Sequence, residues 1–106
     1  MAKYLWEVSY SPQGMKGVLH EGGSSRREMI EKLAANMGGS VESMYFAFGD
    51  NDAYIVAEFP SNVDAAAVAM NVGAVGAASV KTVVLLTPEE VDEATQREVQ
   101  YRAPGE

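Results

Sequence analysis

The chain has 106 residues, a formal net charge of −7 and no cysteine. This length fits one domain, and a hydrophobic share of 47% can build one core without help from a metal or a disulfide. Without cysteine, a disulfide framework, a thiolate metal site and a cysteine nucleophile are all excluded. The acidic balance repels phosphate backbones, so nucleic acid is not an expected partner. With no signal-peptide pattern and no apolar run near ~18 residues, we expect a cytoplasmic protein that does not contact a membrane.

The acidity is concentrated at the C-terminus. Residues 89–106 contain six acids against Arg97 and Arg102, which gives this segment a charge of −4 and leaves residues 1–88 with −3. We therefore predict a folded domain over residues 1–88, followed by an acidic helix and tail over 89–106.

The first predicted elements are a strand and a helix. Residues 3–11 alternate in polarity, which is typical of a strand with Tyr4, Trp6, Val8 and Tyr10 on one face. A two-part connection follows, in which residues 15–21 can form a short turn of helix before Gly22 and Gly23 interrupt it. Ser25 and Glu28 then have the spacing of a capping box, and apolar residues recur at helical spacing up to Met37. This pattern predicts a helix that begins at Ser25 and is stopped by the glycines at 38 and 39.

A hairpin is predicted next. Residues 41–48 and 53–59 are rich in β-branched and aromatic side chains, and the polar segment 49–52 between them is typical of a tight turn. The two strands should pair antiparallel.

The last third of the chain predicts a helix, a strand and a short helix. Ser61 and Asp64 resemble a capped helix start, and Gly73 and Gly76 should weaken this helix after Val72. Residues 80–87 predict a fourth strand, and Pro88 stands where proline is tolerated in the first turn of a helix.

The order β-α-β-β-α-β predicts an α+β fold of ferredoxin-like type, with a four-stranded antiparallel sheet in the order 4-1-3-2 and two helices on one face. The other face is left open. Several strands carry apolar residues on both faces, and a monomer rarely exposes so large an apolar surface. We therefore expect self-association through the open sheet face.

Four segments carry a family resemblance: residues 4–14 (YLWEVSYSPQG), 22–27 (GGSSRR), 45–54 (YFAFGDNDAY) and 81–90 (KTVVLLTPEE). On these, the chain resembles the GYD domain family of small bacterial proteins over residues 4–95. Asn51 stands where the tyrosine of the family's Gly-x-Tyr-Asp turn is usual. The family is in turn similar to the dimeric α+β barrels, in which two four-stranded sheets close face to face. That likeness supports an oligomer but implies no single activity, because such folds serve oxygenases, isomerases and binding modules.

Charged residues near the first crossover are candidates for chemistry. His20 is the only histidine and could act as a general base, although no partner at a fixed spacing accompanies it. Arg26 and Arg27 could hold a carboxylate or phosphate, or could form ion pairs with acids such as Glu21 and Glu31. One histidine and scattered carboxylates predict no metal site.

Aromatic residues could line a ligand cavity or fill the core and the interface. The candidates for ligand contact are Trp6, Tyr45 and Tyr54, which lie on neighbouring predicted strands. Asp50 and Asp52 could serve acid or base chemistry, but residues of this kind are also preferred in tight turns, which is the interpretation we favour.

Three charges interrupt strands that otherwise look buried. In the expected strand order, Glu7, Glu58 and Lys81 meet on the open face. A buried charge is costly unless it is paired, so we expect an ion pair of Lys81 with Glu7 or Glu58, at the subunit interface or in a polar site.

Two functions remain open at this point. One is a homo-oligomeric binding domain whose cavity, near His20, Arg26 and Tyr45, holds a small anionic or aromatic metabolite. The other is a cofactor-free oxygenase or isomerase of the α+β barrel kind, with His20 as the base and Arg26 or Tyr45 stabilising an oxyanion. In a third hypothesis, the helices or the acidic tail recruit another protein.

Overall fold

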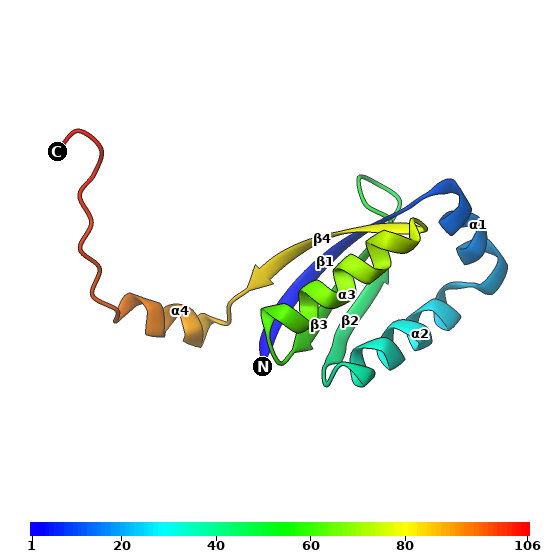
Figure 1. The fold of residues 1–106 in the computed structure, drawn as a ribbon, viewed down its shortest axis with the longest axis horizontal. Coiled ribbons are helices and arrows are strands. Elements are labelled where there is room, and N and C mark those ends of the chain that lie inside the picture. Colours follow the sequence, from blue (N-terminus) through cyan, green and yellow to red (C-terminus); the bar gives the residue numbers. More distant parts are fainter.

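A computed structural model describes all 106 residues (Figure 1). The elements follow one another as β1 (Ala2–Tyr10), α1 (Pro12–Glu21), α2 (Gly23–Asn36), β2 (Ser40–Phe46), β3 (Ala53–Phe59), α3 (Asn62–Val75), β4 (Ala78–Leu85) and α4 (Pro88–Thr95). The strands form one antiparallel sheet in the order β2-β3-β1-β4. The predicted ferredoxin-like α+β fold and its strand order are confirmed.

One face of the sheet is covered by helices (Figure 1). Helix α2 packs over β2, whereas α3 packs over β4 and β3. The core lies between these layers and consists of eleven buried residues: Tyr4, Trp6, Val8, Ile30, Ala34, Ala53, Ile55, Ala57, Phe59, Ala65 and Val68. Every strand residue in this set comes from β1 or β3, the two central strands.

The strand pattern explains why one face is buried. Every second residue of β3 is buried, and the residues between them stay half-exposed. The ring centroid of Phe59 lies 5.3 Å from that of Trp6 and 6.2 Å from that of Tyr4, so three aromatic rings fill one end of the core. Where α2 leads into β2, a Cβ on Gly39 would clash with the backbone oxygen of Glu58, so the close approach requires glycine.

The first crossover has two parts, as predicted, but both helices begin earlier than the sequence indicated. Residues 12–21 form a complete helix, α1, which Ser11 caps through a hydrogen bond from the Gly14 amide. Gly22 alone joins α1 to α2 with a positive φ of 84°, so α2 begins at Gly23. Ser25 therefore lies inside the helix, and the predicted capping box with Glu28 is wrong. The predicted stop is confirmed, since Gly38 follows the helix in a left-handed conformation.

The ends of α3 and the start of α4 agree with the sequence prediction in part. Ser61 caps α3 as predicted, but α3 continues to Val75 instead of fraying after Val72. Gly73 is tolerated in its last turn, and Gly76 ends the helix with a left-handed φ of 83°. Pro88 occupies the first turn of α4 as predicted.

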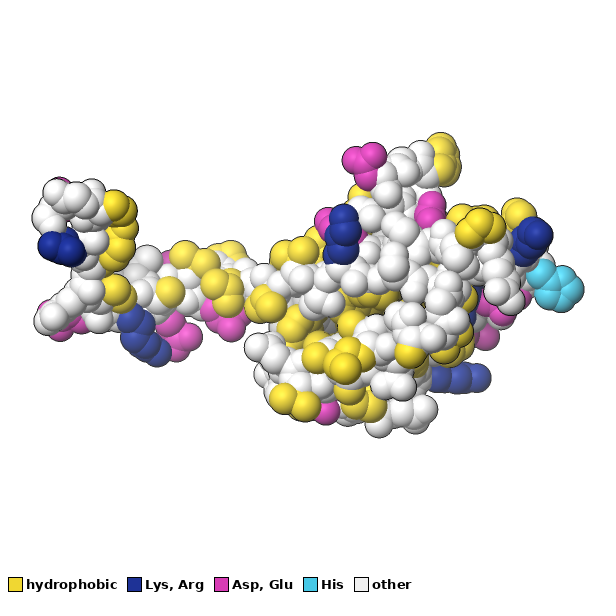
Figure 2. Space-filling model, turned by 45° about the horizontal axis from the view of Figure 1, so that its top comes forward, with side chains coloured by type: hydrophobic (Ala, Val, Ile, Leu, Met, Phe, Trp, Pro, Cys, Tyr) yellow, Lys and Arg dark blue, Asp and Glu magenta, His cyan; other side chains and the backbone are white.

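The C-terminal segment leaves the domain as an extended arm (Figure 1). Helix α4 starts with a complete capping box between Thr87 and Glu90, and residues 96–106 continue without regular structure apart from a turn near the end. Hydrophobic side chains are visible along this arm as well as over the domain (Figure 2), and Val99 and Tyr101 are largely exposed. None of the helices combines the length and the apolar character needed to cross a membrane.

Candidate functional site

A cleft with a mixed lining lies on the helix side of the sheet, where β1 ends and β4 begins. It has a volume of about 390 Å³ and draws its walls from α1, α2 and the last turns of α3. Seven of its twelve lining residues are hydrophobic, among them Met29, Val72 and Val75. Its polar lining includes Gln13, Glu21 and Arg26. The volume and the mixed lining are typical of a small-molecule site.

A smaller chamber of about 20 Å³ lies deeper, between the sheet and α2 and α3. It shares Tyr10, Arg26, Val72 and Ala78 with the cleft, so the two spaces adjoin. Ten of its eleven lining residues are hydrophobic, and Arg26 is the exception. Trp6 forms part of the same lining. This volume is enough for about one water molecule or a single small polar group.

Two buried donors in this region have no hydrogen-bond partner. They are the indole Nε1 of Trp6 and the guanidinium Nε of Arg26. Both are donors only, because neither an indole N–H nor a guanidinium N–H can accept a hydrogen bond. An unsatisfied buried donor costs about 1–3 kcal/mol. The chamber therefore favours a group that presents hydrogen-bond acceptors.

The two arginines of α2 behave differently. Arg26 is turned toward the core, and the same Nε that lacks a hydrogen-bond partner lies 3.7 Å from a carboxylate oxygen of Glu21, which is within ion-pair range but too long for a hydrogen bond. Arg27 points to solvent and pairs with Glu31 one turn along the helix, at 3.9 Å. The ion pairs expected from the sequence thus form, and only Arg26 reaches the cleft.

The other predicted site residues are dispersed. His20 is exposed in the last turn of α1 and does not line the cleft or the chamber. Tyr45 and Tyr54 face each other across β2 and β3 on the open side of the sheet. The predicted cluster of His20, Arg26 and Tyr45 is therefore wrong, and with it the arrangement of base and oxyanion donors that the enzymatic hypothesis needs.

The turn at residues 49–52 has a structural role. Asp52 accepts a hydrogen bond from the Tyr10 amide at 2.8 Å and donates its own amide to the Val8 carbonyl at 2.8 Å. Asn51 accepts a bond from the Ser9 hydroxyl and donates one to the Tyr54 hydroxyl, both at 3.3 Å. Asp52 thus has the structural role in the turn that we favoured for Asp50 and Asp52, and Asn51 ties the turn to both central strands.

Three rows of side chains on the open face span all four strands. Lys81, Glu7, Tyr54 and Tyr45 form the first row; Val83, Leu5, Val56 and Ser43 form the second; Leu85, Lys3, Glu58 and Ser40 form the third. An apolar middle thus lies between two rows that carry charges. Glu7, Glu58 and Lys81 share this face, as the sequence predicted.

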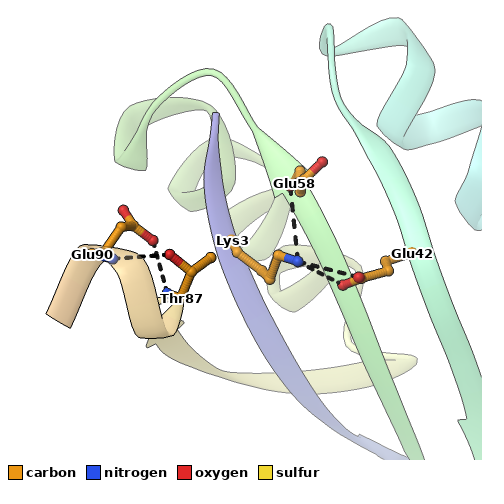
Figure 3. Close-up of polar contacts among 5 residues, drawn as sticks. All are labelled: Lys3, Glu42, Glu58, Thr87 and Glu90. Atoms are coloured by element: carbon orange, nitrogen blue, oxygen red, sulfur yellow. Dashed lines mark hydrogen bonds and ion pairs between the residues drawn. The ribbon is translucent and has the colours of Figure 1, made fainter. Parts of the chain in front are cut away.

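The ion pair on this face is not the predicted one. The Lys3 ammonium lies 3.1 Å from a carboxylate oxygen of Glu42 and 4.0 Å from one of Glu58 (Figure 3). The hydrogen bond from Lys3 to Glu42 is the main cause that raises the pKa of Lys3 above its ordinary value of 10.5. Figure 3 also shows the capping box of α4 beside this cluster.

Lys81 forms no ion pair within the chain. Its Cα atom is paired with that of Glu7, but no carboxylate oxygen lies within 4.0 Å of its ammonium, and Glu58 is engaged by Lys3. The expected Lys81 pair with Glu7 or Glu58 is therefore wrong for a single chain. A β-bulge between Val41 and Ser43 contains Glu42, and the sequence pattern did not reveal it. The place of Lys3 on the open face could have been predicted, because Lys3 alternates with Leu5 and Glu7 along the first strand.

Comparison with known proteins adds one result. The GYD domain family model matches residues 4–95. No curated protein and no solved structure matches the chain significantly. The match covers most of the chain, including all of the sheet except the first two residues of β1, and the three helices around the cleft. The chain therefore belongs to the GYD domain family.

Proposed function

We propose that this protein is a small-molecule-binding domain that works as a homo-oligomer, and that its ligand combines an apolar or aromatic body with a carboxylate. The observation that carries the proposal is the pair of unsatisfied donors, Trp6 Nε1 and Arg26 Nε, on residues that line one apolar chamber at the base of the cleft. Such a chamber selects for acceptors, and the guanidinium charge favours an acceptor that is an anion.

The cleft also limits the rest of the ligand. Met29, Val72 and Val75 offer apolar surface beyond the chamber, and Tyr10 lies between the two spaces. Glu21 lines the cleft as well, so a second negative charge on the ligand would be repelled there. We therefore expect a monocarboxylate whose head lies near Arg26 and whose apolar body lies between α1 and the end of α3.

The oligomer is proposed from the open face. Val83 in its middle row is 41% exposed and Tyr45 in its first row is 73% exposed, and Leu5 and Val56 between them are only partly covered. Edge strands and uncovered apolar faces favour pairing with another chain. The cleft is on the opposite side of the sheet, so two chains can associate face to face without blocking either cleft.

The ligand proposal can be tested with benzoate as the probe. Trp6 is the only tryptophan, so its fluorescence reports directly on the chamber. We expect benzoate to change the Trp6 emission of the wild-type protein in a saturable way, and benzyl alcohol, which has the same ring without the charge, to bind at least about tenfold more weakly.

Two neighbouring variants provide the matched comparison. Arg26→Met should weaken benzoate binding at least about tenfold, whereas Arg27→Met should leave it within about twofold, because Arg27 faces solvent and pairs with Glu31. Equal binding by both variants, or no saturable response in the wild type, would contradict the proposal. Native mass spectrometry of protein from its own cells would then identify any retained carboxylate.

A further inference from the structure

We propose that Lys81 of one chain pairs with Glu58 of a second chain across the open sheet face, and that two such pairs set the register of a twofold dimer whose axis passes over Leu5. The inference rests on the proposed self-association and adds its geometry. Its evidence is the ammonium of Lys81, which has no ion pair within the chain, and a surplus of carboxylates on the same face.

The charges on this face do not balance locally. The cluster of Lys3, Glu42 and Glu58 has two carboxylates for one ammonium, which leaves one negative charge at one end of the face. Lys81 lies toward the other end, exposed and without an ion pair. A second copy of the chain supplies the complement to both, because each copy presents the unpaired ammonium of Lys81 and more carboxylates on this face (Glu7, Glu42 and Glu58) than Lys3 alone can pair.

The register places these two charges symmetrically about Leu5. Lys81 of β4 pairs with Glu7 of β1, and Glu58 of β3 pairs with Lys3 of β1. Leu5 lies midway between Glu7 and Lys3 on the central strand. Lys81 thus lies on β4, on one side of β1, in the row of Glu7. Glu58 lies on β3, on the other side of β1, in the row of Lys3.

This symmetry permits a closed dimer. The twofold axis would lie in the interface and pass over Leu5, perpendicular to the line from Lys81 to Glu58. Rotation about this axis places Lys81 of each copy opposite Glu58 of the other copy. With strands about 4.8 Å apart and same-face residues about 6.8 Å apart, the strands of the two sheets then cross steeply, close to the orthogonal mode of sheet packing. The apolar row of Val83, Leu5 and Val56 meets its own copy at the centre.

Charge reversal tests the pairing directly. Lys81→Glu and Glu58→Lys should each raise the dimer dissociation constant at least about tenfold, because each places two like-charged pairs in the interface. An equimolar mixture of the two variants should recover a dissociation constant within about threefold of the wild-type value, because both contacts of the mixed dimer then join opposite charges. Light scattering on a dilution series and native mass spectrometry report these species.

The matched control is Lys32→Glu, which makes the same charge change on α2, on the helix side of the sheet. We expect it to leave the dissociation constant within about twofold of wild type. Near-ultraviolet circular dichroism confirms that each variant is folded.

The possible outcomes distinguish the Lys81–Glu58 pairing from the proposed self-association. If the wild-type chain is monomeric at all concentrations, both the self-association and the pairing are wrong. If the wild type is a dimer but the two single variants dimerise equally well, or if mixing them restores nothing, only the Lys81–Glu58 pairing is overturned. Benzoate binding at the cleft is measured independently of either result.

Discussion

The two faces of the sheet are built from the same strands but differ in composition and in how they are completed. On the helix side, β1 and β3 present Tyr4, Trp6, Ile55 and Phe59, all at most 3% exposed. On the open side, the intervening residues of those strands include Lys3, Glu7 and Glu58, and all of them are at least partly exposed. One face is a core that the chain completes by itself. The other has the mixed character of an interface.

The contrast assigns separate tasks to the two faces. On the helix side, the cleft lies where α1 meets the end of α3, and the buried donors of Trp6 and Arg26 belong to residues of the chamber beside it. The open side instead carries charges around an apolar row, and in the proposed dimer such charges would set partner and register more than they add stability. Substitutions on the two faces should therefore affect different measurements.

The largest expected effect comes from removing an aromatic ring on the helix side. Phe59→Ala should lower the free energy of unfolding by about 3–5 kcal/mol, because it empties a fully buried site next to Trp6 and Tyr4. Urea unfolding, followed by far-ultraviolet circular dichroism at a protein concentration low enough to keep the chain monomeric, measures this loss.

Tyr45→Ala is the control on the open side, where the ring is 73% exposed. In the monomer it should change the free energy of unfolding by less than about 0.5 kcal/mol. A loss comparable to that of Phe59→Ala would show that the open face contributes to the fold of a single chain, and the contrast between the faces would fail.

A smaller effect is expected from adding volume at adjacent positions of β3. Ala57 is fully buried and Val56, its neighbour, is half-exposed on the open side. Ala57→Leu should cost about 1–3 kcal/mol, because a well-packed core must shift to admit the larger side chain. Val56→Leu should stay within about 0.5 kcal/mol in the monomer. Thermal unfolding of the two variants side by side provides the comparison, and equal melting temperatures would contradict it.

Much of the fold could be predicted because local signals agree with the final packing. The alternation in β1 and the capped start at Ser61 are properties of short segments, so the elements followed from them, and the order of these elements then predicted the strand order. The predicted ends of helices were wrong where a residue outside the local pattern sets the helix boundary. Gly22 ends α1 and starts α2 with one positive φ, which moved the start of α2 ahead of Ser25. Gly73 stays helical because Gly76, not Gly73, supplies the left-handed stop.

The candidate site was less predictable, because it depends on which face each side chain occupies. Trp6 and Arg26 were both singled out in the sequence, but only the packing of α2 on the sheet shows that they share a chamber. Tyr45 lies away from Trp6 and Arg26, on the open side of β2. His20 is exposed at the end of α1 and lies away from them as well. The Lys3 cluster depends on a bulge in β2, which period-two alternation does not reveal.

The smallest expected effect is electrostatic and belongs to the open face. Lys3 pairs with Glu42 and Glu58 near the surface, where solvent screens the interaction, so Lys3→Met should destabilise the monomer only slightly at neutral pH. Because these contacts raise the pKa of Lys3 in the folded chain above its ordinary value of 10.5, their stabilisation is fully present below that pH and is lost as the pH rises through the folded pKa. The difference in unfolding free energy between wild type and Lys3→Met should thus be constant from about pH 7 to 9 and should shrink above about pH 10.5. Urea unfolding across this range tests the sign, and a difference that grows in alkali would show that Lys3 does not stabilise the fold through its charge.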